Sequence, residues 1–172
     1  MNASRLLSAA VAAFIASGCT IPVPSPAPTP ATPVASGRYG ATVSRIFDLI
    51  NAQRRHQGLP GLVYNAQLDQ MATIQAQNMA HFQKMAHVIP EASLPTMTDR
   101  ARYVAYPFGR LAENVALGFP DAETVVQGWM TSKGHRANIL NSDVLETGIA
   151  IARSSAGGLY YCQVFGRRLS SL

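Results

Sequence analysis

Cysteine is scarce in this chain, since its 172 residues contain only Cys19 and Cys162. Secreted domains that depend on disulfides carry an even set of cysteines inside the folded part. Cys19 ends a leader-like N-terminal segment, which leaves Cys162 without a partner. The sequence therefore excludes a disulfide scaffold, and it predicts a domain held together by its apolar core with Cys162 buried and reduced in a strand.

Charged residues are also few, at 13% of the chain, whereas hydrophobic residues make up 48%. This composition is too apolar for a disordered chain and is typical of a globular protein, and the length suffices for one domain with a core. The net charge of +5 comes from basic residues scattered along the sequence without interleaved aromatic residues. Because a nucleic-acid groove needs clustered basic residues, we expect no nucleic-acid partner.

The apolar run at residues 6–15 is too short to cross a bilayer. Arg5 precedes it and small residues at 16–18 lead from it to Cys19, a pattern typical of an export signal. The end of this segment resembles the lipobox of bacterial lipoproteins, in which cleavage leaves the cysteine as an acylated N terminus. We therefore predict a lipoprotein-type signal peptide over residues 1–19, with a lipid on Cys19 that attaches the protein to a membrane. The alternative is an ordinary secretory cleavage site with an incidental cysteine.

Proline is concentrated just after this segment, in the stretch IPVPSPAPTPATPVASG at residues 21–37. Alternating prolines favour an extended polyproline II chain of about 3 Å per residue, which cannot pack a core. We therefore assign residues 20–38 to a Pro-rich linker that holds the domain away from the membrane, and residues 39–168 to one folded domain.

Helical periodicity marks three segments of this domain. The apolar residues of segment 43–50 recur at i, i+3, i+4 and i+7, which predicts an amphipathic helix that Gly58 ends. Asn65 is a candidate cap of a second helix that runs to about residue 85. A third helix is predicted from 121 to 133, with Gly134 as its stop and a tight turn over 136–140.

The period changes near the C terminus. Segments 147–151 and 159–165 alternate like strands and are joined by a Gly- and Ser-containing loop, which predicts a hairpin. Segment 111–117 has residues typical of a short strand or a turn, and the proline-containing segment 88–108 is predicted as an irregular excursion with a helical turn near its end. Together these elements predict an α+β fold, a three-layer α-β-α sandwich with a central, mainly antiparallel sheet.

Candidate functional residues lie at the ends of these elements. His87 follows the second helix, Glu113 stands in a Glu-Asn pair, and Ser132 and His135 flank the end of the third helix. Such positions allow a scaffold to direct side chains into a cleft. Two imidazoles from separate elements can bind zinc or another divalent metal. Glu113 could orient one imidazole or act as a base toward a bound water.

Three interpretations of this group stay open: a hydrogen-bond network that fixes loops, a metal site, and a catalytic site. Catalytic zinc usually has three protein ligands, and only His87 and His135 are candidates here. Ser132 has no evident His-Asp relay and could equally cap the helix end, so we assign no catalytic residue. Asn114 and Asn138 are interpreted as loop clamps, because asparagine readily bonds nearby backbone groups.

Five motifs follow one another along the chain: IFDLINAQRRHQGLPGLVYNAQLDQMA, the histidine after the second helix, AEN, WMTSKGHRANIL and YYCQVFG. Their order resembles the bacterial branch of the CAP superfamily, which includes cysteine-rich secretory, antigen 5 and plant pathogenesis-related proteins. The resemblance covers residues 41–166, and it implies a cleft holding two histidines and two acidic residues. These positions fall on His87, Glu113 and His135, whereas Ser132 stands at the second acidic position.

This resemblance implies binding roles more than chemistry, with lipids such as sterols, glycans and partner proteins as ligand classes. We therefore predict an exported envelope protein, facing the periplasm or the cell exterior, whose domain is a binding module for a lipid, glycan or protein. One alternative is a metal-dependent hydrolase acting on an envelope substrate. The other is a structural or signalling lipoprotein with a vestigial cleft.

Overall fold

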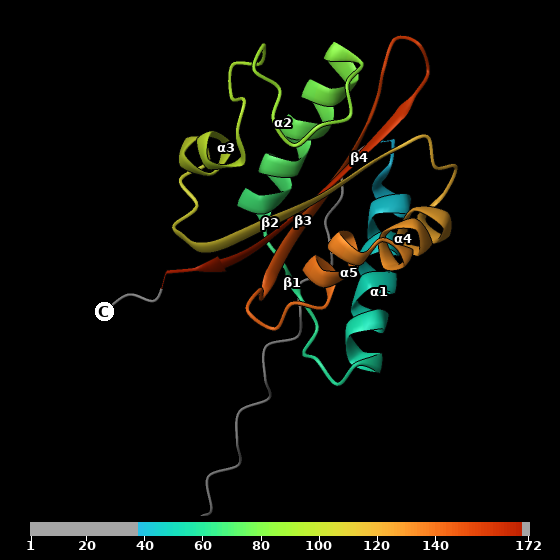
Figure 1. Ribbon diagram of the computed structural model, residues 1–172, viewed down its shortest axis with the longest axis vertical. Coiled ribbons are helices and arrows are strands. Elements are labelled where there is room, and N and C mark those ends of the chain that lie inside the picture. The colour runs from blue at the N-terminus through green and yellow to red at the C-terminus, as the bar shows by residue number, and fades with distance from the viewer. Residues whose placement is uncertain (1–37, 170–172) are drawn as a thin grey trace, which may run out of the picture.

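The computed structural model describes residues 38–169 (Figure 1). The predicted export signal, the lipid site at Cys19 and the Pro-rich linker lie outside the described residues, apart from Arg38. In chain order the elements are α1 (Gly40–His56), β1 (Val63–Tyr64), α2 (Ala66–Phe82), α3 (Met97–Tyr103), β2 (Phe108–Leu117), α4 (Ala122–Thr131), α5 (Lys133–Ile139), β3 (Glu146–Arg153) and β4 (Leu159–Arg168).

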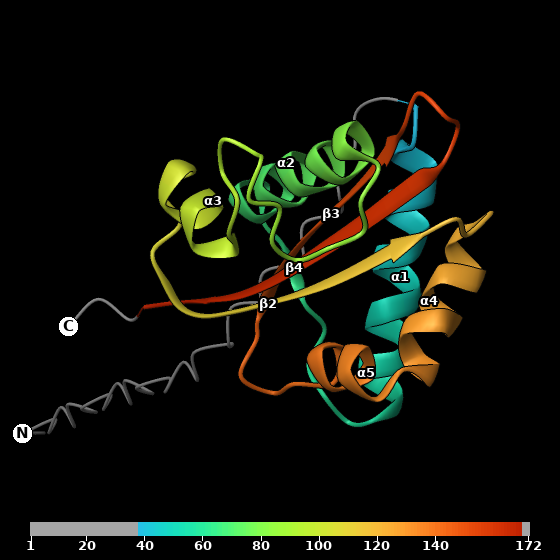
Figure 2. The same cartoon turned by 45° about the horizontal axis from the view of Figure 1, so that its top comes forward.

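The strands form one sheet in the order β1-β3-β4-β2. β4 pairs with β2 and with β3 in antiparallel fashion, and the short β1 pairs with β3 in parallel. Helices α2 and α3 cover one face of the sheet, and α1, α4 and α5 cover the other (Figure 2). Each face has its own apolar core. The fold is therefore the predicted α+β sandwich of three layers.

Local sequence signals explain several element boundaries. The apolar stripe of α1 is buried as its spacing predicts. The Asn65 side chain accepts hydrogen bonds from the backbone N–H groups of Gln67 and Leu68, so it caps α2 as expected. The C-terminal hairpin is confirmed as β3 and β4. Cys162 lies in β4, where it is free and fully buried, also as predicted.

The end of the third helix differs from the prediction. α4 ends at Thr131, Ser132 adopts an extended conformation with ψ of 122°, and a new helix α5 starts at Lys133. Gly134 therefore lies inside a helix and does not stop one, and residues 136–139 continue this helix where a tight turn was predicted. A glycine stops a helix by adopting a left-handed conformation, and Gly134 is not among the glycines with positive φ.

Two further elements exceed what periodicity predicted. Segment 111–117 belongs to the ten-residue strand β2, which pairs with β4 from Phe108 to Leu117. α3 lies within the predicted excursion and begins at a capping box made by Thr96 and Asp99. Within residues 38–169, no helix combines the length and apolar character needed to cross a membrane.

Candidate functional site

Glu113 lies at the centre of the site. It belongs to β2, opposite Val164 of β4, and its side chain is only 3% exposed. Its neighbour Val115, two residues on, belongs to the core beneath α2 and α3. Because side chains alternate across a sheet, Glu113 faces the same layer. The fold thus buries a carboxylate, which requires polar partners at that point.

Arg100 of α3 is the main partner of this carboxylate. Its side chain is 0% exposed, and its Nη2 donates to Glu113 Oε2 at 2.6 Å. Its Nη1 donates to Gln75 Oε1 of α2 at 2.5 Å. Cys162 of β4 lies beside the pair, with Sγ 3.5 Å from Glu113 Oε2. The sequence predicted a helical turn in this region but no role for Arg100. The capping box Thr96-x-x-Asp99 is the local signal for the helix that carries it.

His87 contacts the second oxygen of the same carboxylate. Its Nδ1 lies 2.9 Å from Glu113 Oε1, while its side chain stays 57% exposed. The bond to Glu113 raises the pKa of His87, because the carboxylate favours the imidazolium. The segment before His87 is held by Gln75 Nε2, which donates to the Ala86 carbonyl at 2.6 Å.

His135 of α5 is half-buried beside β2. Burial lowers its pKa, and the positive charge of His87 adds to this effect. Asn114 Nδ2 donates to the His135 carbonyl at 3.2 Å, and Asn138 Nδ2 donates to Asn114 Oδ1 at 2.9 Å. These bonds tie α5 to β2, the clamp role that the sequence predicted for both asparagines.

Ser132 and His135 also border a cavity of about 270 Å³. Ser132 joins α4 to α5, where its backbone N–H caps α4 and its side chain makes no cap hydrogen bond. Trp129 is 1% exposed and donates from Nε1 to the Val115 carbonyl at 3.3 Å, which places it in the core as predicted. The remaining lining residues are Met85, Val115, Ala116, Leu117, Phe119, Gly128 and Trp129.

The structure thus brings His87 and Arg100 into direct contact with Glu113, and it places Ser132 and His135 at an adjacent apolar cavity. Both oxygens of Glu113 already accept hydrogen bonds, one from Arg100 and the other shared with His87. Among the described residues, no three histidine, cysteine or acidic side chains are grouped so that they could hold a metal ion. The geometry is therefore that of an ion-paired network beside a cavity.

Comparison with known proteins identifies the family. The model of the CAP, cysteine-rich secretory protein, family matches residues 47–165. The chain belongs to this family. It is 30% identical over 139 residues to YkwD of Bacillus subtilis, a match that covers 81% of this chain and 52% of YkwD. The chain thus spans about half the length of this curated relative, and 34% of a second one, the B. subtilis membrane protein YlbC.

Solved structures agree with this assignment. An extracellular protein with an SCP domain from Bacillus anthracis has a TM-score of 0.68 at 30% identity, over 74% of this chain and 41% of that one. An outer surface protein from Borrelia burgdorferi shares the fold, with a TM-score of 0.70 at 19% identity, over 77% of this chain and 96% of that one. NaASP2, crystallised with Zn²⁺, shares the fold more distantly. Its TM-score is 0.53 at 12% identity, over 76% of this chain and 82% of that one. The chain therefore carries a CAP domain of the kind found in bacterial extracellular proteins.

Proposed function

We propose that this CAP domain is an envelope-facing binding module whose cavity beside His135 takes the apolar part of a lipid-like ligand. The cavity itself carries the proposal. Its walls are mostly aliphatic and aromatic, while Ser132 and His135 supply polar groups. Ligand sites in proteins combine an apolar lining with a few polar groups in this way. The volume of about 270 Å³ suits one short chain segment or one ring and not a whole lipid.

The state of Glu113 favours binding over catalysis. A general base needs a carboxylate oxygen within reach of the proton that it removes. Arg100 and His87 engage both oxygens of Glu113, and the Arg100 pair is fully buried. Protonation of this carboxylate would break a buried ion pair, so Glu113 serves better as an anchor for His87 and α3 than as a base. This argues against the hydrolase alternative.

Export and a lipid anchor are part of the same proposal. The apolar run that leads to Cys19, followed by the Pro-rich segment, supports a lipoprotein-type signal and a spacer. The extracellular and outer surface proteins that share the fold support an envelope location. A lipid on Cys19 would keep the cavity close to membrane lipids, which would favour a ligand of this class.

The single tryptophan makes the cavity directly testable. Trp129 lines it, so a brominated ligand that enters should quench its fluorescence. We expect saturable quenching by 10-bromodecanoate. Gly128→Leu should abolish it, because even a Cβ at Gly128 would stand 2.7 Å from Cζ of Phe119 in the cavity wall. The matched control is Gly134→Leu, also in a helix, where a Cβ meets nothing within 4 Å.

Two results would contradict this proposal. One is an absence of quenching in the wild-type protein. The other is equal quenching in Gly128→Leu and wild type, which would place the ligand elsewhere. If neither the bromodecanoate nor a panel of soluble glycans binds, the vestigial-cleft alternative gains support.

A metal-dependent role is the second candidate, favoured by the surroundings of the two histidines. The Nδ1 of His87 contacts a carboxylate, an arrangement that orients a metal-binding histidine and raises its basicity. Burial lowers the pKa of His135, which favours the neutral imidazole, the form that binds a metal. Two imidazoles alone do not make a closed zinc site. We therefore expect only weak zinc binding by His87 and His135, which calorimetry on the double alanine variant would test.

A further inference from the structure

Strand β3 has one edge that its neighbour covers only in part. β1 pairs with β3 at two positions, of which Tyr64↔Thr147 is the last, whereas β3 continues to Arg153. Backbone groups on an open sheet edge are a template for another extended chain. The second half of β3 therefore presents an edge that no strand of the described chain pairs.

Alternation along β3 identifies the open groups. The Thr147 carbonyl accepts a hydrogen bond from Asn65 N–H at 2.9 Å on this edge. Every second residue of a strand directs its backbone groups to the same edge. The next one, Ile149, has its carbonyl 3.5 Å from a tyrosine hydroxyl of β1. Ile151 follows, and its edge-facing N–H and C=O find no partner among residues 38–169.

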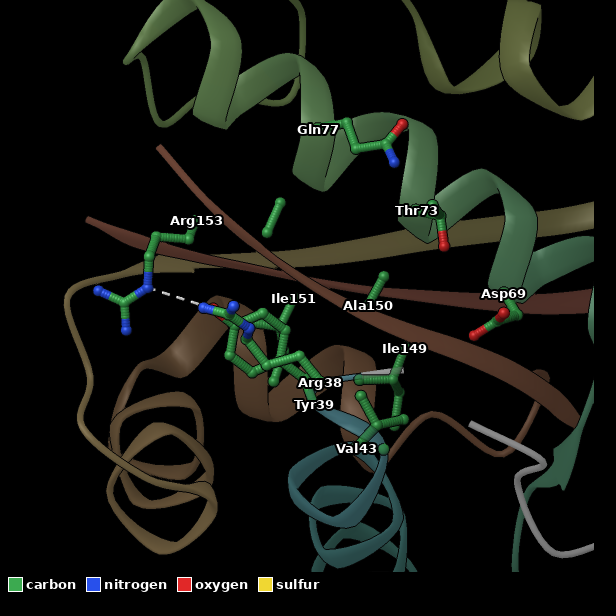
Figure 3. A pocket seen from close by; sticks show the side chains of 12 residues that line it. Arg38, Tyr39, Val43, Asp69, Thr73, Gln77, Ile149, Ala150, Ile151 and Arg153 are labelled. Atoms are coloured by element: carbon green, nitrogen blue, oxygen red, sulfur yellow. Dashed lines mark hydrogen bonds between the residues drawn. The ribbon is translucent and has the colours of Figure 1, made fainter. Parts of the chain in front are cut away.

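A groove of about 460 Å³ runs along this edge (Figure 3). α2 forms one wall with the polar side chains of Thr73 and Gln77, and the start of α1 forms the other with Tyr39 and Val43. The strand between Ile149 and Arg153 forms the floor. Four residue steps of about 3.3 Å give roughly 13 Å, room for about four extended residues. None of these residues lines the cavity beside His135.

The charges along the groove are asymmetric. Arg38 and Arg153 lie at the end where β3 finishes, and both are exposed. Arg153 is oriented by hydrogen bonds from Nε to the Tyr39 hydroxyl at 3.3 Å and from Nη1 to the Gly157 carbonyl at 2.8 Å. The carboxylate of Asp69, at the opposite end, is already engaged by the hydroxyl of Tyr64. Two guanidinium groups at one end favour a carboxylate there.

We propose that this groove binds an extended peptide of about four residues, which adds to the β3 edge and places its C-terminal carboxylate beside Arg38 and Arg153. A carboxylate at that end makes the added strand parallel to β3, the direction that β1 already has on the same edge. Backbone bonds to Ile151 provide the affinity, as in other cases of strand addition. Alternate side chains face the apolar wall at Val43 and the polar wall at Thr73.

The test uses the full chain and the peptide acetyl-Thr-Val-Thr-Val with a free carboxylate, measured by calorimetry. We expect the affinity to fall roughly fivefold when the peptide C terminus is amidated. This factor corresponds to the loss of one exposed charge-assisted hydrogen bond. Arg153→Gln should weaken binding of the peptide with the free carboxylate by the same factor. Arg55→Gln is the control, since Arg55 has equal charge and is exposed in the last turn of α1, away from the groove.

Two N-methylated peptides test the strand geometry itself. Only every second peptide amide faces β3, so methylation of one internal valine or threonine amide should reduce binding at least about tenfold while methylation of the next leaves it unchanged. Equal effects at both positions, or no binding by any peptide, would overturn the proposal. So would a dimer in light scattering that Arg153→Gln dissociates, because a second copy would then occupy the edge.

Discussion

Loss of the Arg100 guanidinium should destabilise the domain strongly. The Arg100 and Glu113 side chains are 0% and 3% exposed, and their closest atoms lie 2.6 Å apart. Removing one partner of a buried ion pair costs about 3–5 kcal/mol, because it leaves an uncompensated charge. His87 contacts the other carboxylate oxygen and offsets part of this loss. We therefore expect Arg100→Met to lower the free energy of unfolding by about 3 kcal/mol.

The assay is urea unfolding followed by the fluorescence of Trp129, the single tryptophan. The structure offers a matched control in Arg45→Met, because Arg45 and Glu123 are 2.7 Å apart but each is 55% exposed. An exposed pair of this kind contributes about 0–1 kcal/mol. Equal losses in both variants would refute the inference that burial makes the Arg100 pair important.

A double variant separates the lost interaction from the stranded charge. In Arg100→Met with Glu113→Leu, no buried charge remains, so part of the stability lost in the single variant should return. A double variant less stable than the single one would show that Glu113 is stabilised mainly by other partners, such as His87 or Cys162.

Further tests concern His87 and the two cysteines. Because the folded-state pKa of His87 is raised, its contribution to stability should be full below about pH 6.5 and disappear as the pH rises through the raised value, a dependence that His87→Gln should remove in urea titrations. Burial raises the pKa of the Cys162 thiol, so in a Cys19→Ala background a thiol reagent should label the protein only after unfolding. Cys162→Ser should lower the free energy of unfolding by about 1 kcal/mol or less, because the new hydroxyl can donate a hydrogen bond to the nearby Glu113 carboxylate. In a fully apolar site this hydroxyl would find no partner. Cys19→Ala should move the protein from the membrane to the soluble fraction or leave an unprocessed precursor, and a wild-type protein found wholly soluble with an unmodified N terminus would contradict lipid attachment.

Local signals predicted the helices and the hairpin well. The stripe of α1 and the Asn65 cap of α2 act within a few residues, so their sequence pattern is sufficient. β1 was not predicted, because a strand of two residues shows no periodicity and because its partner β3 lies about 80 residues further along the chain. The full length of β2 was not predicted either, because its strand conformation depends on pairing with the distant strand β4.

At the break between α4 and α5, a local signal was present but predicted the wrong boundary. Gly134 is a helix-stop residue by its local preference. In the structure the helix already ends at Thr131, and clamps from Asn138 to β2 hold a second short helix in place. Tertiary contacts therefore overrode the local preference of a single residue.

Periodicity and motif order were enough to predict the layers of this domain, because both are properties of the chain. Motif order also predicts that His87, Glu113 and His135 form one group, of which the structure shows the contact between His87 and Glu113. The nature of that group depends on the folded arrangement. Arg100 looked like one of many scattered basic residues, yet the fold buries it against Glu113. A buried carboxylate needs a compensating charge, and the identity of that charge depends on which distant helix packs above the strand. The same applies to the open edge of β3, which exists because β1 ends where α2 begins.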